Sequence, residues 1–235
     1  MKLRHAAASP FVRKVMVLAH EQGLLGRIEL VATAVSPVQT NADLAAENPL
    51  MKVPSLLTDD GQVLFDSPVI CEYLDSLATD RKYFPVAGPA RWTALRQQAL
   101  GDGILDALVL TRYETTRPED KRWSGWTDGQ LKKAHQGLAA VEREDLSGPR
   151  IIGHVTFGCV FGYLDFRFPD DGWRGRHPKL AAWYREVEQL PRCRRPSRRR
   201  NRGKTPGGQG CALRSLTRSG RRGTSVSAAP SLAPR

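Results

Sequence analysis

The chain has 235 residues, 40% of them hydrophobic and 26% charged, which is the composition of an ordinary soluble globular protein. This length allows two packed domains of about 100 residues each. The net charge of +12 would favour nucleic-acid binding if it were spread over the chain. Residues 192–235, however, hold 13 of the 36 Lys and Arg residues and no Asp or Glu. The remaining 23 basic and 24 acidic residues give residues 1–191 a net charge of −1, so the excess charge says little about what they bind.

Membrane and secreted classes are excluded by the apolar segments and the cysteines. The longest apolar stretches, such as residues 155–164, fall short of the roughly 20 residues that a spanning helix needs. Arg13 and Lys14 interrupt the first apolar segment, so it does not read as an export signal. Thiols without paired spacing or neighbouring histidines favour a reducing cytoplasm over a disulfide framework or a metal site. The four cysteines are Cys71, Cys159, Cys193 and Cys211.

The first 78 residues alternate between strand and helix patterns. Apolar residues recur at helical spacing from Pro10 until Gly23, which supplies a stop signal. Asp59-Asp60-Gly61 predicts a hairpin turn, and Ser67 followed by Pro68 predicts a helix start with Ser67 as N-cap. In chain order we predict strands and helices at 2–6 (strand), 10–23 (helix), 28–32 (strand), 33–47 (loop with a short helix), 53–58 and 62–65 (strands) and 67–77 (helix). This order describes a small mixed sheet covered by helices.

After residue 78 the pattern becomes helical. A linker at 79–89 carries two prolines. Helices are then predicted at 90–115, 127–146, 155–166 and 178–190. The fold class is therefore an α/β half followed by an all-α half. Residues 192–235 have no periodic apolar pattern and read as a disordered basic tail.

Two segments of the first half and one of the second carry recognisable motifs. They are Ser9-Pro10-Phe11-Val12-Arg13-Lys14, Asn48-Pro49-Leu50-Met51-Lys52-Val53-Pro54-Ser55 followed by Phe65-Asp66-Ser67-Pro68, and Gly162-Tyr163-Leu164-Asp165-Phe166-Arg167. In this order and spacing, residues 1–191 resemble the glutathione S-transferase family, and in particular its bacterial members. The resemblance implies a thioredoxin-like glutathione-binding domain at 1–78 and an all-helical domain at 90–191. It also implies a homodimer, with glutathione as co-substrate, a small electrophile as second substrate, a role in detoxification, and no metal.

Asp66 and Ser67 are the predicted site for the γ-glutamyl end of glutathione. A hydroxyl and backbone N–H groups at a helix N-terminus favour a carboxylate, and the Asp66 carboxylate would face the ammonium group. Such charge-assisted contacts contribute about 1.5–3 kcal/mol each. The alternative is that Ser67 is only an N-cap and Asp66 only a loop carboxylate.

Val53-Pro54 resembles the cis-proline loop of the family. By that analogy the Val53 N–H and C=O face outward and pair with the cysteinyl backbone of glutathione as an added strand would. The alternative is a trans proline at a strand edge.

Ser9 is the catalytic candidate because it opens the first helix of a thioredoxin-like domain. The sequence there is Ser-Pro-Phe-Val, without a Cys-x-x-Cys pair, so dithiol exchange is excluded. A hydroxyl at a helix N-terminus can donate a hydrogen bond to the sulfur of glutathione and stabilise the thiolate, by about 2.7 kcal/mol for a pKa lowered by about 2. The alternative is that Ser9 only caps the helix, and Arg13, one turn on, is read as a solvated surface charge.

The sequence indicates less about which residues bind the second substrate. Asp102 and Asp106 lie one turn apart on the same face of one predicted helix. They line the mouth of a pocket or, in the alternative that we favour, they belong to a solvated face or cap a helix. Trp123 and Trp126 fall in a predicted polar loop that would cover a pocket.

Two segments depart from the family pattern. Residues 151–154 lack the Ser/Thr-x-x-Asp pair that would cap the following helix, so we expect that helix to be less well anchored, and His154 is read as structural. The basic tail is read either as a shifted reading frame in a GC-rich gene, which we favour, or as an arm for nucleic acid. The leading function is therefore a cytoplasmic glutathione transferase that activates the glutathione thiol for conjugation or thiol exchange with a small electrophile. The alternatives are a non-catalytic binding or regulatory member of the fold and, from another class, nucleic-acid binding through the tail, which would be non-specific.

Overall fold

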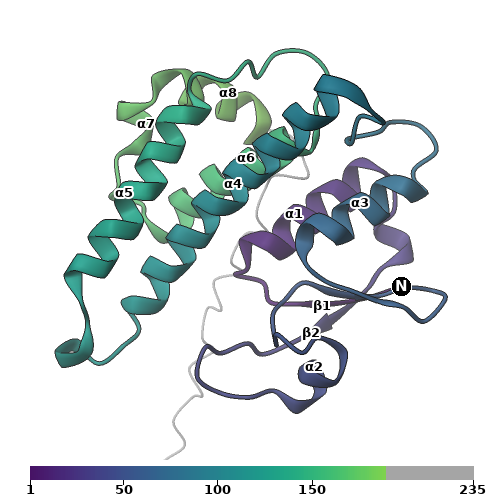
Figure 1. The fold of residues 1–235 in the computed structure, drawn as a ribbon, viewed down its shortest axis with the longest axis horizontal. Coiled ribbons are helices and arrows are strands. Elements are labelled where there is room, and N and C mark those ends of the chain that lie inside the picture. Colours follow the sequence, from purple (N-terminus) through teal and green to yellow (C-terminus); the bar gives the residue numbers. More distant parts are fainter. Residues whose placement is uncertain (189–235) are drawn as a thin grey trace, which may run out of the picture. The chain divides into compact units, whose positions relative to one another are not determined.

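The computed structural model describes residues 1–188, whose first half contains a four-stranded sheet in the order β2-β1-β3-β4 (Figure 1). β1 (Lys2–His5) pairs in parallel with β2 (Glu29–Ala32) and antiparallel with β3 (Ser55–Leu57). β3 in turn pairs antiparallel with β4 (Val63–Leu64). The hairpin between β3 and β4 turns at Gly61, whose φ of 88° is one that glycine adopts without strain.

Two helices cover one face of this sheet and a third lies on the other side. α1 (Pro10–Glu21) and α3 (Ser67–Leu77) pack against each other, whereas α2 (Ala42–Glu47) lies across the sheet from them (Figure 1). Burying an aliphatic side chain fully contributes about 1.5–3 kcal/mol, so these helices hold the strand ends in place. The fully buried core residues include Leu3, Val15, Leu18, Leu56, Ile70 and Leu74.

The second half is built around α6 (Ile152–Arg167), in which every residue from Ile152 to Leu164 is buried. α4 (Gly88–Glu114) packs against both α6 and α5 (Ser124–Val141). The short α7 (Trp173–Arg176) and α8 (Pro178–Glu188) follow, and both contribute side chains to the same core. A helix that is apolar all round has to be buried on every side, which is the position that α6 takes.

The predicted fold class, an α/β thioredoxin-like half followed by an all-α half, is confirmed. Several boundaries differ: α4 begins at Gly88, α5 spans Ser124–Val141 rather than 127–146, and α6 begins at Ile152 rather than 155. Trp126 therefore lies on α5 and not in a loop. The 3-10 turns η1 (Leu25–Arg27) and η2 (Glu119–Lys121) and the helix α7 were not predicted.

The predicted divisions of the chain are not all tested by this structure. The described residues fall into one compact unit, so the boundaries at residues 78 and 90 stay predictions. The predicted end of the last helix at residue 190 and the basic tail at 192–235 lie outside the described residues. Within the described part, no helix combines the length and the apolar character that crossing a membrane requires.

The close packing of α4 on α6 depends on a glycine at position 101. A Cβ atom there would lie 2.6 Å from Thr156 Cγ2 and 3.2 Å from Phe157 Cδ1. We expect Gly101→Ala to lower the free energy of unfolding by about 1–3 kcal/mol, because Thr156 is buried and cannot move away. Chemical denaturation of the purified variant measures this change.

Gly103, on the same helix, is the matched control. No atom lies within 4 Å of the position that a Cβ would take at Gly103. Alanine is favoured over glycine in a helix by about 1 kcal/mol, so Gly103→Ala should raise the free energy of unfolding. Equal effects of the two substitutions would contradict the close contact at Gly101.

Candidate functional site

Ser9 is the N-cap residue of α1. Its Oγ accepts a hydrogen bond from the backbone N–H of Val12 at 3.3 Å, and its own N–H donates to Ala6 O at 3.0 Å. The capping bond uses an oxygen lone pair. Among the described residues, no hydrogen bond uses the proton of the Ser9 hydroxyl. Capping and donation to a ligand are therefore compatible, and the two interpretations of Ser9 do not compete.

The loop before β3 is organised by Asn48, which is 1% exposed. Its side-chain amide donates to Lys52 O at 2.9 Å and its side-chain oxygen accepts from Leu50 N at 3.0 Å. This closed loop delivers the chain to Val53 and Pro54, and the peptide bond between them is cis. The first residue of the Asn-Pro-x-x-Lys-Val-Pro motif thus has a structural role that the sequence interpretation did not assign.

The cap of α3 lies one residue earlier than predicted. The N-cap residue is Asp66, whose carboxylate accepts from the N–H of Ser67, and Ser67 is the first helical residue. The prediction of Ser67 as N-cap is therefore wrong, because Asp66 takes the extended backbone conformation of a cap and Ser67 is already helical. The Ser67 hydroxyl is fully buried and has no hydrogen-bond partner among the described residues. An unsatisfied hydroxyl at a helix N-terminus fits a carboxylate ligand.

The sheet brings these three segments to the same end. Arg4, near the end of β1, pairs with Ser55 at the start of β3, and Leu64 at the end of β4 pairs with Leu56. The loop leading to Ser9 leaves β1 at this end, the Val53–Pro54 loop enters β3 there, and β4 ends there shortly before Asp66. The topology thus gathers residues that are up to 58 positions apart in the sequence.

α4 borders this region through two carboxylates, which differ in their surroundings. Asp102 accepts from Lys14 Nζ at 2.6 and 2.7 Å, and the Lys14 side chain is fully buried. The interpretation of Asp102 as part of a solvated face is therefore wrong. Burial raises the pKa of Asp102 against the opposing charge of Lys14. Asp106, in contrast, is exposed, as the solvated-face interpretation expects, and its partial desolvation raises its pKa, with Lys52 opposing and Asp66 adding to the rise.

Lys14 was not singled out by the sequence interpretation, although a signal for it exists. It lies one turn before Leu18 on α1, and Leu18 is fully buried. Helical spacing therefore places the Lys14 side chain on the buried face. Because a buried ammonium needs an anionic partner, the position predicts a carboxylate on a neighbouring element.

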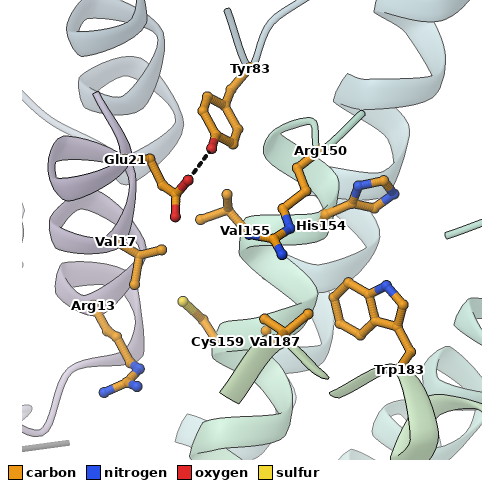
Figure 2. Close-up of a pocket in the computed structure, with 11 residues that line it drawn as sticks. Arg13, Val17, Glu21, Tyr83, Arg150, His154, Val155, Cys159, Trp183 and Val187 are labelled. Atoms are coloured by element: carbon orange, nitrogen blue, oxygen red, sulfur yellow. Dashed lines mark hydrogen bonds between the residues drawn. The ribbon is translucent and has the colours of Figure 1, made fainter. Parts of the chain in front are cut away.

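A separate pocket lies between α1 and α6 (Figure 2). Val17 and Glu21 line it from α1, and Val155 and Cys159 line it from α6. The Glu21 carboxylate accepts a hydrogen bond from the Tyr83 hydroxyl at its upper end. Among the described residues that line this pocket, none belongs to the predicted glutathione site. The pocket runs along α1 away from Ser9 and is distinct from that site.

Two further side chains differ from their predicted settings. His154 Nδ1 accepts from the backbone N–H of Ile151 at 3.4 Å, so this histidine supplies one half of a capping pair that the sequence interpretation took to be missing. Burial lowers the pKa of His154, which favours the neutral ring that can accept this bond. Arg13 is partly buried, with its Nε 3.8 Å from the position of a Cβ on Gly162, so its interpretation as a solvated surface charge is wrong.

The described residues contain no group of three or more His, Cys, Asp or Glu side chains placed to hold a metal ion. Cys71 is fully buried, and burial raises the pKa of its thiol to about 12, which makes it a poor nucleophile. The groups that the structure brings to this end of the sheet include the Ser9 and Ser67 hydroxyls and the Asp66 carboxylate.

A thioredoxin-like sheet with a cis-proline loop, followed by a helical half, defines a protein of the glutathione-transferase fold. The model of the glutathione S-transferase N-terminal domain matches residues 8–77, and that of the C-terminal domain matches residues 124–186. The uncharacterized GST-like protein YibF of Escherichia coli K12 is 32% identical over 189 residues, which cover 77% of this chain and 90% of YibF. The chain therefore belongs to the glutathione S-transferase family.

Solved structures give the same assignment. A glutathione transferase family member from Pseudomonas fluorescens Pf-5, solved with bound glutathione, is 48% identical with a TM-score of 0.80, over 82% of this chain and 96% of that one. Another structure from that organism contains bound S-(propanoic acid)-glutathione, at 47% identity, a TM-score of 0.76 and the same coverage. A glutathione S-transferase of Methylobacterium radiotolerans in complex with glutathione sulfonate is 34% identical, with a TM-score of 0.73 over 82% and 92% of the two chains.

Proposed function

We propose that this protein binds glutathione, activates its thiol and transfers it to a small electrophile. The observation that carries the proposal is the meeting of Ser9, Val53 and Ser67 at one end of the sheet. Each offers a group that a different part of glutathione needs. The relatives with bound glutathione or a glutathione derivative support glutathione as the ligand.

The thiol is the reacting group. With the Ser9 oxygen fixed by the N–H of Val12, the hydroxyl proton is directed to the glutathione sulfur and stabilises its anion. The N-terminal end of α1 adds its partial positive charge. The thiolate then attacks the electrophile and a carbon–sulfur bond forms. In a substitution the leaving group departs with its bonding electron pair, and in an addition to an unsaturated carbonyl compound the electron pair moves to the carbonyl oxygen and the resulting enolate takes a proton from water. Ser9 remains a hydrogen-bond donor throughout and forms no covalent bond.

The other groups hold the tripeptide. The N–H and C=O of Val53, next to cis Pro54, pair with the cysteinyl backbone in the proposed complex. The buried Ser67 hydroxyl and the first N–H groups of α3 receive the γ-glutamyl carboxylate. Asp66 accepts from the N–H of Ser67 through Oδ1, and its Oδ2 faces the γ-glutamyl ammonium in the proposed complex.

The product class, the cell compartment and the assembly follow from the same proposal. The derivative bound to the relative at 47% identity is a thioether of glutathione, which is what conjugation produces. A cytoplasmic, detoxifying conjugation reaction is consistent with the buried thiols of Cys71 and Cys159. For the homodimer, Val69 on α3 and Trp92 on α4 leave apolar surface exposed beside the Arg91–Glu72 ion pair, which favours a second copy there.

The glutathione site is tested by two substitutions. We expect Asp66→Asn and Ser67→Ala each to weaken glutathione binding by about 10- to 100-fold, because each removes one charge-assisted contact. Asn keeps the N-cap, so α3 stays formed in the first variant. Titration calorimetry on the full chain measures the dissociation constants. Ser76→Ala, at the exposed end of the same helix, and Asp80→Asn should leave them unchanged. Unchanged affinity in both site variants would place the γ-glutamyl end elsewhere.

Measurements of turnover distinguish an enzyme from a protein that only binds glutathione. A non-catalytic member of the fold would be retained on immobilised glutathione but would convert none of a panel of aryl halides, unsaturated carbonyl compounds and peroxides. Conversion of at least one of them at a rate above that of free glutathione is the result the proposal requires.

A further inference from the structure

The C-terminal end of α6 lies at the same end of α1 as Ser9. Arg13, near the start of α1, has its Nε 3.8 Å from the position of a Cβ on Gly162, in the second half of α6. Val17, further along α1, lines a pocket with Cys159, which precedes Gly162 on α6. The two helices are therefore antiparallel, and the last turn of α6 extends toward the N-terminal end of α1.

α4 ends beside this same turn of α6. Gln97 contacts Gly153, and four residues on, Gly101 contacts Phe157, so α4 and α6 run in the same direction. Burial raises the pKa of the Tyr163 hydroxyl on α6, and the neighbouring Arg167 guanidinium opposes this rise through its charge and a side-chain hydrogen bond, while Tyr113 and Arg112 at the end of α4 are close enough to influence it. Three aromatic side chains that are at least partly exposed, Phe11, Tyr113 and Phe166, lie near these ends of α1, α4 and α6 and give the region an aromatic surface, whereas Tyr163 is buried in the core.

Arg167 stands out on this surface because it is partly buried and has no acidic partner in the described part of the chain. Its guanidinium carbon lies 4.1 Å from the centroid of the Phe166 ring, which fixes the plane of the guanidinium group. Its Nε is buried and has no hydrogen-bond partner among residues 1–188. The nearest carboxylate in the sequence, Asp165, instead accepts from Trp173 and Arg174.

A buried guanidinium N–H without an acceptor carries a desolvation cost that an anionic ligand removes. A planar guanidinium is also the group best suited to a carboxylate. We propose that the second substrate is an aromatic electrophile carrying a carboxylate, and that Arg167 binds that carboxylate while the ring packs on the aromatic surface. This inference rests on the proposed glutathione function and names the substrate class of the same site.

The reaction needs no further reagent. With an aryl chloride, the glutathione thiolate forms a bond to the ring carbon that bears chlorine, and chloride leaves with the bonding electron pair. The carboxylate takes no part in bond making. Arg167 therefore determines which electrophile binds. Replacing Arg167 should weaken the binding of the acid more than the binding of an uncharged analogue.

The experiment compares two glutathione thioethers, S-(para-carboxy-ortho-nitrophenyl)glutathione and its methyl ester, by titration calorimetry on the full chain. We expect the wild type to bind the acid more tightly than the ester by about 10- to 100-fold. Arg167→Ala should remove this preference, and Arg167→Lys should keep part of it. The matched control is Arg143→Ala, which removes an exposed arginine just beyond the end of α5 and should keep the full preference.

The outcomes separate this inference from the function on which it rests. If Arg167 only balances the helix dipole, Arg167→Ala will change stability and leave the ratio of acid to ester affinity as in the wild type, which overturns the inference. A wild type that binds glutathione and prefers neither thioether overturns it as well, while the glutathione function stands. A wild type that does not bind glutathione overturns both.

Discussion

Asp102→Ala lowers the free energy of unfolding by about 3–5 kcal/mol, the largest stability effect that we expect from a single substitution in this chain. The Lys14 side chain is fully buried and Asp102 holds its ammonium group with both carboxylate oxygens, at 2.6 and 2.7 Å. Removing the carboxylate leaves a buried charge without its counter-ion. Denaturant unfolding followed by far-ultraviolet circular dichroism measures the change.

The same ion pair is not expected to contribute much net stability. Burial raises the pKa of Asp102 in spite of the Lys14 charge, so desolvation outweighs the attraction between the two groups. The double variant Lys14→Met with Asp102→Leu should therefore lie within about 1–2 kcal/mol of the wild type. Glu29→Ala, which breaks the exposed 3.8 Å pair between Lys2 and Glu29, should cost less than about 1 kcal/mol. A double variant as unstable as Asp102→Ala would contradict this account.

Ser9→Ala lowers the kcat/KM of conjugation at neutral pH by about 100-fold, the largest effect on activity that we expect. A thiol pKa lowered by about 2 corresponds to roughly 2.7 kcal/mol of thiolate stabilisation, and the variant loses the hydroxyl that supplies most of it. Glutathione affinity should change by less than about threefold, because the γ-glutamyl and backbone contacts remain. Steady-state kinetics and calorimetry on the same preparation give both quantities.

The control for Ser9 has to account for its second role, because Ser9 also caps α1 and its loss costs about 1 kcal/mol of stability. Asn41→Ala removes an equivalent cap, since the Asn41 side chain accepts from Leu44 N at 3.1 Å at the start of α2. This variant should lose similar stability and keep its turnover. Equal losses of turnover in Ser9→Ala and Asn41→Ala would show that the serine acts only through helix stability.

The order of strands and helices was predictable from the sequence because the signals are local. Gly23 ends the first helix pattern, and the Asp59-Asp60-Gly61 turn sets the hairpin. The starts of α5 and α6 were missed because neither has a polar N-cap side chain: Trp123 and Ile151 occupy those positions. Such helix starts are set by packing in the folded chain, which a local pattern does not contain.

The meeting of the proposed site segments was predictable where a motif fixes the backbone, whereas contacts between the two halves of the chain were not predictable. The resemblance to the family indicated Ser9, Val53 and Asp66 as parts of one site, and the register of the strands explains why these segments meet. The ion pair between Lys14 and Asp102 joins residues 88 positions apart, and no local signal specifies that contact. The placement of Arg167 likewise depends on the packing of α6 on α1.

The most direct test of the central claim is the pKa of the glutathione thiol bound to the full chain, measured from thiolate absorbance in the ultraviolet as a function of pH. The account predicts a value about 2 below the roughly 8.5 of a free cysteine thiol for the wild type. Ser9→Ala should return it to nearly the free value while glutathione stays bound. A titration of wild-type-bound glutathione that coincides with that of free glutathione would contradict thiol activation by this site.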